Sequence, residues 1–82
     1  MNREQLKAQL ITQRIDPTAY SLSGGLPNEC LVLNQAQNGT WEVYYSERGE
    51  RSGLRIFESE EGAVQYFLDV ILHDSAVRRM NQ

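Results

Sequence analysis

The chain has 82 residues, which fits one small domain spanning 1–82, where a binding surface is easier to build than an enclosed catalytic cleft. Eleven Asp and Glu against eight Lys and Arg give a net charge of −3, which disfavours nucleic acid as a partner. No stretch is long and apolar enough for a signal peptide or a membrane span, so we expect a cytoplasmic protein without a membrane partner.

Residues 2–15 are predicted to form a first helix. Asn2 suits the N-cap position, and Gln5, three positions further on, suits the returning hydrogen bond of a capping box. Leu6, Leu10 and Ile11 form one apolar stripe among polar side chains. Pro17 predicts the end of this helix, because the residue before a proline disfavours the helical conformation.

Two strands are predicted next, over residues 19–23 and 30–36, separated by a glycine- and proline-containing loop. After the second strand, Asn38-Gly39 is compatible with a two-residue turn or with a three-residue loop over 37–39. We expect the three-residue loop, because it keeps the apolar side chains of both strands on one face. Its register makes two pairs, Leu33 with Val43 and Leu31 with Tyr45.

Residues 40–57, TWEVYYSERGERSGLRIF, form the clearest hairpin of the chain, because two alternating apolar and polar runs flank Arg48-Gly49. With these two residues as the turn, one side of the hairpin carries two apolar pairs, Val43 with Leu54 and Trp41 with Ile56. The opposite side carries Glu42 facing Arg55 and Tyr44 facing Gly53. The pattern therefore places Leu54 and Ile56 in the core.

A second helix is predicted to begin at Ser59, which suits the N-cap, with Glu60 and Glu61 in a first turn that favours acidic side chains. Its apolar stripe consists of Ala63, Val64, Phe67, Leu68, Ile71 and Leu72. Residues 73–82 are polar and basic, and we expect them to form a frayed C-terminal tail.

These elements predict an α+β fold: a two-layer sandwich of order α-β-β-β-β-α, with an antiparallel meander sheet and both helices packed on one of its faces. The other sheet face is left open in this arrangement.

The sequence offers little for catalysis. His73 is the only histidine and Cys30 the only cysteine, so neither has a second residue of its kind for a metal site. A single cysteine also allows no internal disulfide and is typical of a reducing compartment. We therefore expect no enzyme activity, no cofactor and no bound metal.

Two surfaces are candidates for binding a partner protein. The first is the open sheet face, where an aromatic side chain is flanked by charged ones: Tyr44, Glu42 and Arg55. The second is an acidic surface near the hairpin turn and the start of the second helix: Glu47, Glu50, Glu58, Glu60 and Glu61. For both, the alternative is an ordinary solvated surface without a partner.

Three segments carry a resemblance to a known family: YSLSGGLPNE at 20–29, WEVYYSERGERSG at 41–53 and FESEEGAVQYFL at 57–68. The chain resembles small bacterial immunity proteins, which are encoded beside polymorphic or contact-dependent growth inhibition toxins. The resemblance implies a cytoplasmic, non-enzymatic antitoxin that binds the C-terminal domain of one cognate toxin. Many such toxins are nucleases with basic clefts, to which an acidic inhibitor is attracted.

Seven residues are the candidate contacts, chosen from register and charge: Glu42, Tyr44, Arg55, Glu47, Glu50, Glu60 and Glu61. We expect the free protein to be a monomer. The alternative function is a small oligomerising or regulatory adaptor that associates through the open sheet face into a homodimer.

Overall fold

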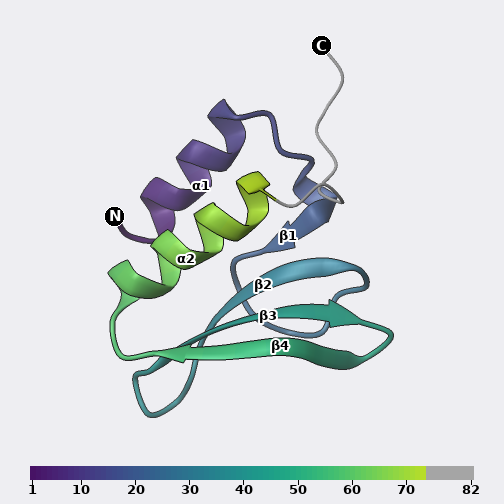
Figure 1. Ribbon diagram of the computed structural model, residues 1–82, viewed down its shortest axis with the longest axis vertical. Helices are drawn as coiled ribbons and strands as arrows, with labels where there is room; N and C mark the ends of the chain where they lie inside the picture. The colour runs from purple at the N-terminus through teal and green to yellow at the C-terminus, as the bar shows by residue number, and fades with distance from the viewer. Residues whose placement is uncertain (74–82) are drawn as a thin grey trace.

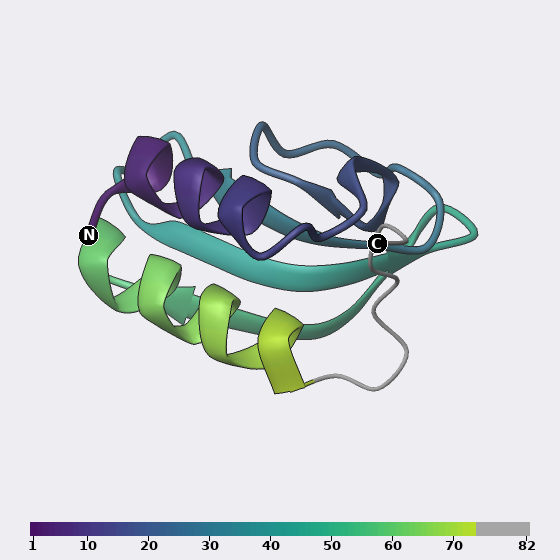
Figure 2. The same ribbon diagram turned by 90° about the horizontal axis from the view of Figure 1, so that it is seen from above.

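The computed structural model describes residues 1–73, in which two helices, α1 and α2, lie side by side over one face of a four-stranded sheet (Figures 1 and 2). The elements follow one another as α1-β1-β2-β3-β4-α2, and the sheet has the strand order β1-β2-β3-β4. The expected α+β fold is confirmed. The predicted tail beyond His73 lies outside the described residues, and among residues 1–73 no helix is long and apolar enough to cross a membrane.

Helix α1 spans Arg3–Thr12 and begins with the predicted capping box. The Asn2 side chain accepts a hydrogen bond of 2.8 Å from the Gln5 N–H, and the Gln5 side chain accepts one of 2.9 Å from the Asn2 N–H. These two bonds satisfy N–H groups that have no partner within the helix.

Helix α1 ends three residues earlier than expected, because Arg14 adopts a left-handed conformation with φ 61°. The Arg14 N–H then bonds to the Ile11 carbonyl and the Ile15 N–H to the Leu10 carbonyl, both at 3.0 Å, in the Schellman pattern. This turn carries Ile15 back into the core and leaves Ile11 exposed, so the predicted place of Ile11 in the apolar stripe is wrong.

Strand β1, Tyr20–Ser21, follows a 3₁₀ turn at Pro17–Ala19 and pairs with β2, Cys30–Gln35. This pair is parallel, with Tyr20 opposite Leu31, so the prediction of a fully antiparallel meander is wrong for β1. A parallel neighbour requires the chain to travel back along the sheet before the next strand begins. Residues 22–29 make this return.

The hairpin of β2 and β3, Trp41–Glu47, has the predicted register, with Leu33 opposite Val43 and Leu31 opposite Tyr45. Its three-residue loop closes through a 2.8 Å hydrogen bond from the Ala36 N–H to the Thr40 carbonyl. Gly39 has φ 91°, the left-handed conformation that the loop requires and that glycine adopts without strain.

Strand β4, Glu50–Phe57, follows the predicted Arg48-Gly49 turn, and the first pairs of the hairpin are as predicted. A bulge then inserts one extra residue of β4 opposite Tyr44, so that Val43 faces Arg55 and Trp41 faces Phe57. The predicted pairing of Val43 with Leu54 and of Trp41 with Ile56 is therefore wrong.

A one-residue shift moves every following side chain to the other face of the sheet. Leu54 and Ile56 lie away from the helices and are 45% and 63% exposed, so their predicted place in the core is also wrong.

Helix α2 spans Glu60–His73, and its capping residue is Ser59, whose hydroxyl accepts a 3.1 Å hydrogen bond from the Gly62 N–H. The apolar stripe of α2 meets that of α1 and the inward side chains of β2 and β3. The buried core between helices and sheet comprises Leu6, Leu10, Ile15, Ala19, Leu31, Leu33, Trp41, Val43, Ala63, Val64, Phe67, Leu68 and Ile71.

Candidate partner-binding face

The outer face is the side of the sheet that is turned away from α1 and α2. It is not fully open. Residues 24–29, here called the covering segment, lie over part of it on their way from β1 to β2. Beneath this segment lies a second, smaller buried cluster made of Cys30, Val32 and Tyr44.

Tyr44 holds the covering segment in place. Its side chain is only 1% exposed, and its hydroxyl donates a 2.7 Å hydrogen bond to the carbonyl oxygen of Gly25. The guanidinium of Arg51 lies 5.0 Å from the centre of the Tyr44 ring. Burial, with a smaller contribution from Glu42, raises the pKa of the phenol above its usual value, although Arg51 opposes the shift. Tyr44 therefore supports the outer face from within and is not an exposed contact residue.

Gly24 lets the covering segment approach the sheet closely. It adopts φ +76°, and a Cβ at this position would collide with the side-chain oxygen of Asn34. Its N–H donates a 3.1 Å hydrogen bond to the Leu33 carbonyl. At the far end of the segment, the Asn28 side chain accepts a 3.4 Å bond from the Arg48 N–H. Bonds at both ends and at Tyr44 thus fasten the segment to the sheet.

Glu42 lies on the outer face as predicted, and its carboxylate accepts a 3.0 Å hydrogen bond from the Asn34 side chain. Arg55 does not lie there. Because of the bulge it is on the helix side, with its guanidinium 5.4 Å from the centre of the Tyr66 ring on α2. The predicted group of Glu42, Tyr44 and Arg55 therefore does not form one exposed surface.

The predicted acidic surface is also divided. Glu47 and Glu50 flank the β3–β4 turn, whereas Glu60 and Glu61 begin α2 at the opposite end of β4 (Figure 1). A strand of this length separates its ends by roughly 20 Å. The Glu60 carboxylate also accepts a 2.9 Å hydrogen bond from the Arg3 N–H, so it ties α2 to the start of α1.

The outer face carries three exposed apolar side chains that the sequence did not indicate. Ile56 faces outward because it pairs with Glu42, and Leu54, two residues earlier on β4, lies on the same side. Leu26 is 49% exposed in the covering segment, next to the Gly25 that Tyr44 binds. We call Leu26, Leu54 and Ile56 the outer apolar patch. A glycine inside a strand often marks a bulge, so Gly53 was the signal in the sequence for the bulge that creates this patch. In the structure Gly53 has φ 65°.

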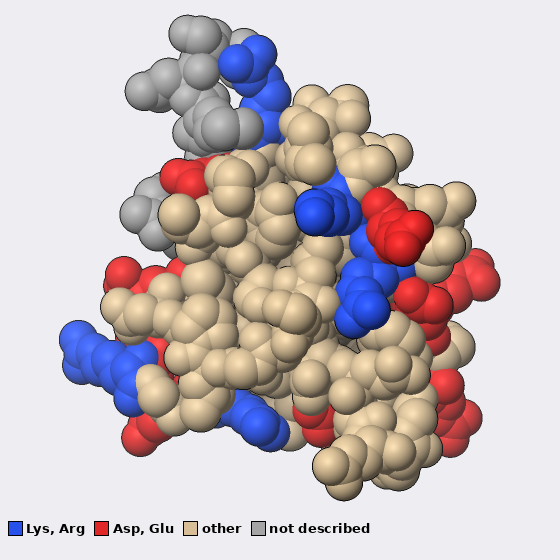
Figure 3. Space-filling model, turned by 180° about the vertical axis from the view of Figure 1, so that it is seen from behind, with Lys and Arg blue, Asp and Glu red and all other residues tan. Residues whose placement is uncertain are grey.

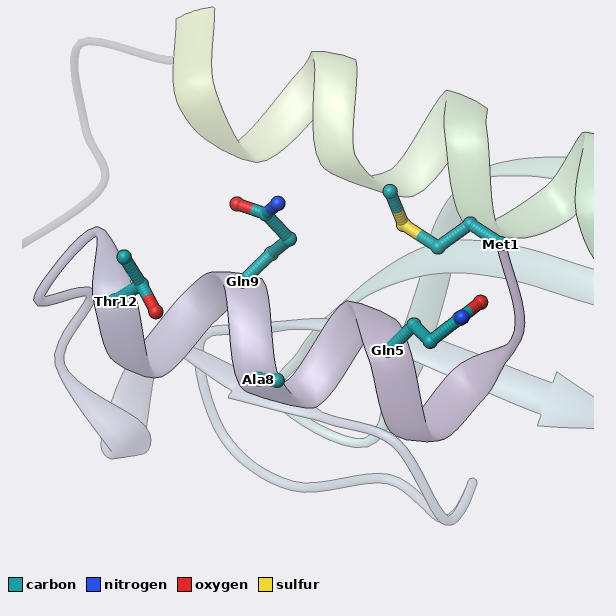
Figure 4. A pocket seen from close by; sticks show the side chains of 5 residues that line it. All are labelled: Met1, Gln5, Ala8, Gln9 and Thr12. Carbon is teal, nitrogen blue, oxygen red and sulfur yellow. The ribbon is translucent and has the colours of Figure 1, made fainter.

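The groove beside α1 offers less chemistry. It is lined by uncharged residues of one helix side, Met1, Gln5, Ala8, Gln9 and Thr12, with Met1 and Gln9 extending toward α2 (Figure 4). These side chains provide hydrogen bonds and a thioether but no titratable group. Across residues 1–73, no group of His, Cys, Asp or Glu side chains is arranged to hold a metal ion.

Comparisons with known proteins give no match: no family model, no curated protein and no solved structure is similar to this chain.

Proposed function

We propose that this protein is an immunity protein, which binds a cognate bacterial toxin domain and neutralises it without catalysis. The observation that carries the proposal is the outer apolar patch. Leu26, Leu54 and Ile56 are three of the five large apolar side chains that are exposed among the described residues, and the other two, Met1 and Ile11, belong to the α1 side of the molecule. Exposed apolar side chains that gather on one face are typical of protein-binding sites.

The surroundings of the patch support protein binding. Glu42 is fixed by Asn34, and Arg51 is positioned over Tyr44, so one charge of each sign flanks the apolar side chains. Apolar contacts at the centre with polar groups at the rim are the usual composition of an interface. The fastened covering segment presents Leu26 without needing to be ordered on binding, which lowers the entropy loss of association.

The acidic balance of the chain supports a basic partner, since a net charge of −3 attracts a positively charged toxin domain before contact. The resemblance to small immunity proteins supports the same class of function. A toxin that degrades nucleic acid would provide a basic substrate cleft of this kind.

The experiment begins with the reading frames beside this gene: the proposal expects one of them to encode a toxin-like C-terminal domain, which is then used in a protection assay. Cells that express the toxin domain should survive only when this protein is co-expressed. The double variant Leu54→Asp/Ile56→Asp should lose protection, because two carboxylates would be buried at the interface. Ile11→Asp is the matched control, since Ile11 is 58% exposed but belongs to α1, on the helix side of the sheet.

Equal survival with and without this protein would contradict the immunity function. Equal protection by the wild type and by the double variant would contradict the assignment of the patch. Thermal melting of both variants shows whether each remains folded.

Self-association is the second candidate function, because Leu54 and Ile56 belong to β4, which has a sheet neighbour on one side only among residues 1–73. Two features of β4 oppose it. A bulge and the charged residues Arg51 and Arg55 lie along this edge, and both devices are typical of edges that avoid pairing. Sedimentation equilibrium distinguishes the two candidate functions. A dimer at micromolar concentration supports the adaptor function, and a monomer supports the inhibitor.

A further inference from the structure

A shallow cleft of about 370 Å³ lies between α1 and β1, on the helix side of the sheet and away from the outer apolar patch. It is lined by Arg3, Glu4, Lys7, Tyr20, Leu22 and Ser23. Seen from behind, the molecule shows basic and acidic side chains gathered over α1, next to a broad area without charge (Figure 3). We propose that this cleft binds a carboxylate attached to a small apolar group, independently of the toxin-binding function.

Arg3 is held in position before any ligand arrives. One guanidinium nitrogen, Nη1, donates a 3.3 Å hydrogen bond to the Leu22 carbonyl, and the guanidinium carbon lies 5.9 Å from the centre of the Trp41 ring. The backbone N–H of the same residue is bound by Glu60 at 2.9 Å. A guanidinium has five N–H donors in a planar fork, so the bond to Leu22 leaves donors for a carboxylate.

Lys7 and Tyr20 complete the set of donors. Lys7 lies one helical turn after Arg3 on the same side of α1, so both cations border one cleft. Burial, with a smaller contribution from Asp16, raises the pKa of the Tyr20 phenol above its usual value. The Tyr20 phenol therefore stays neutral near pH 7, and a neutral hydroxyl is able to donate a hydrogen bond to an anion.

The charge of the lining favours a single negative charge. Among the lining residues, Arg3 and Lys7 contribute two positive charges and Glu4 one negative charge, a net charge of +1. The Glu60 carboxylate on the Arg3 N–H and the Asp16 carboxylate near Tyr20 lie outside the lining and weaken this positive field. A carboxylate matches this charge, whereas a phosphate monoester, with a charge of about −1.5 to −2 at pH 7, exceeds it and is repelled by Glu4. Leu22 and the ring of Tyr20 provide apolar contacts for the group that carries the carboxylate.

Lys7 is the only lysine of the chain, so its side chain can be observed alone. Protein labelled with ¹³C at the lysine ε-carbon is titrated, at constant ionic strength, with N-acetyl-leucine, isovalerate, N-acetyl-leucine amide and inorganic phosphate. We expect a saturable shift of the Lys7 signal with the carboxylates, at millimolar concentration, and none with the neutral amide.

Saturation by both carboxylates assigns the cleft to free apolar acids as well as chain termini, and saturation by N-acetyl-leucine alone assigns it to a peptide terminus. Both outcomes support a carboxylate site. A shift with the amide as large as with the acid overturns the proposal, as does tighter binding of phosphate than of either carboxylate.

Two variants test the residues. Arg3→Gln and Lys7→Gln should each weaken N-acetyl-leucine binding at least tenfold, followed for both through the backbone amide signals of Leu22 and Ser23. Arg48→Gln is the matched control, because Arg48 is an exposed cation at the β3–β4 turn, and it should leave the affinity unchanged. Lys7 is exposed, so unchanged affinity in Lys7→Gln overturns the proposal even if Arg3→Gln fails to fold.

Discussion

The two hairpins that share β3 differ in how their register is determined. In the β2–β3 hairpin every pair follows from keeping apolar side chains together. In the β3–β4 hairpin the same reasoning holds from Glu47–Glu50 to Tyr45–Ser52 and then fails by one residue. Strand β2 lies between two neighbours and beneath covering layers on both sides, whereas β4 is an edge strand and largely exposed. Burial therefore fixes the register of the β2–β3 hairpin. In the exposed β3–β4 hairpin, Gly53 allows a bulge that shifts the register by one residue.

The largest effect is expected from a substitution on the helix side of the sheet, which both hairpins share. Trp41 packs in the helix-side core, and truncation by Trp41→Ala should lower the free energy of unfolding by about 3–5 kcal/mol, as usual for large-to-small changes in a core. Urea denaturation followed by far-UV circular dichroism measures the change. A loss below about 1 kcal/mol would contradict the placement of Trp41 in the core between the sheet and the helices.

Substitution of Tyr44, which lies on the shared strand β3, tests the packing of the outer face. As a surface residue it would tolerate truncation, but its burial under the covering segment predicts that Tyr44→Ala costs about 3–5 kcal/mol, like other large aromatics. Tyr44→Phe keeps the ring and loses only the hydrogen bond to Gly25, so it should cost about 0.5–1.5 kcal/mol.

Hydrogen exchange separates the contribution of the Tyr44 hydroxyl bond from that of the packing of its ring. In Tyr44→Phe the Gly24 amide, which donates to the Leu33 carbonyl at the start of the covering segment, should exchange faster, while the amides of β2 remain protected. Unchanged exchange across the covering segment would show that the hydroxyl does not fasten it.

Gly53 tests the bulge directly. Its φ of 65° is unfavourable for residues with a Cβ, so Gly53→Ala should destabilise the protein by about 1–2 kcal/mol. Gly53→Asn is the matched variant, because asparagine tolerates this conformation better and should lose less. The ranking of the two variants in urea denaturation carries the test, and a neutral or stabilising alanine would indicate a regular strand without the bulge.

The smallest expected effects come from the side chains that the bulge moves outward. Leu54→Ser and Ile56→Thr should each change the free energy of unfolding by no more than about 0.5 kcal/mol, as surface changes usually do. In the regular register both residues would lie in the core, and each substitution would cost several times more. These two variants therefore separate the alternatives with one denaturation curve each.

The sequence was sufficient for features that depend on local chemistry or on clear periodicity. The capping box of α1, the Ser59 cap, the three-residue loop before β3 and the packing of α2 all follow from short patterns. It was insufficient where a residue adopts an unusual conformation that its type does not require, as Arg14 does at the end of α1.

The candidate site was harder to foresee for the same reason. The exposure of Leu54 and Ile56 depends on a one-residue bulge, and the burial of Tyr44 depends on a parallel β1 that sends residues 24–29 across the outer face. Neither arrangement changes the alternation of apolar and polar residues along the chain. Both arise from long-range packing, to which a local pattern is insensitive.

The central claim is that β4 shifts by one residue at Gly53 and thereby exposes Leu54 and Ile56 on the outer face. Cross-strand nuclear Overhauser contacts in a ¹⁵N- and ¹³C-edited spectrum test it most directly. The structure predicts contacts of Val43 with Arg55 and of Glu42 with Ile56. Contacts of Val43 with Leu54 and of Trp41 with Ile56 would restore the regular register and contradict the account.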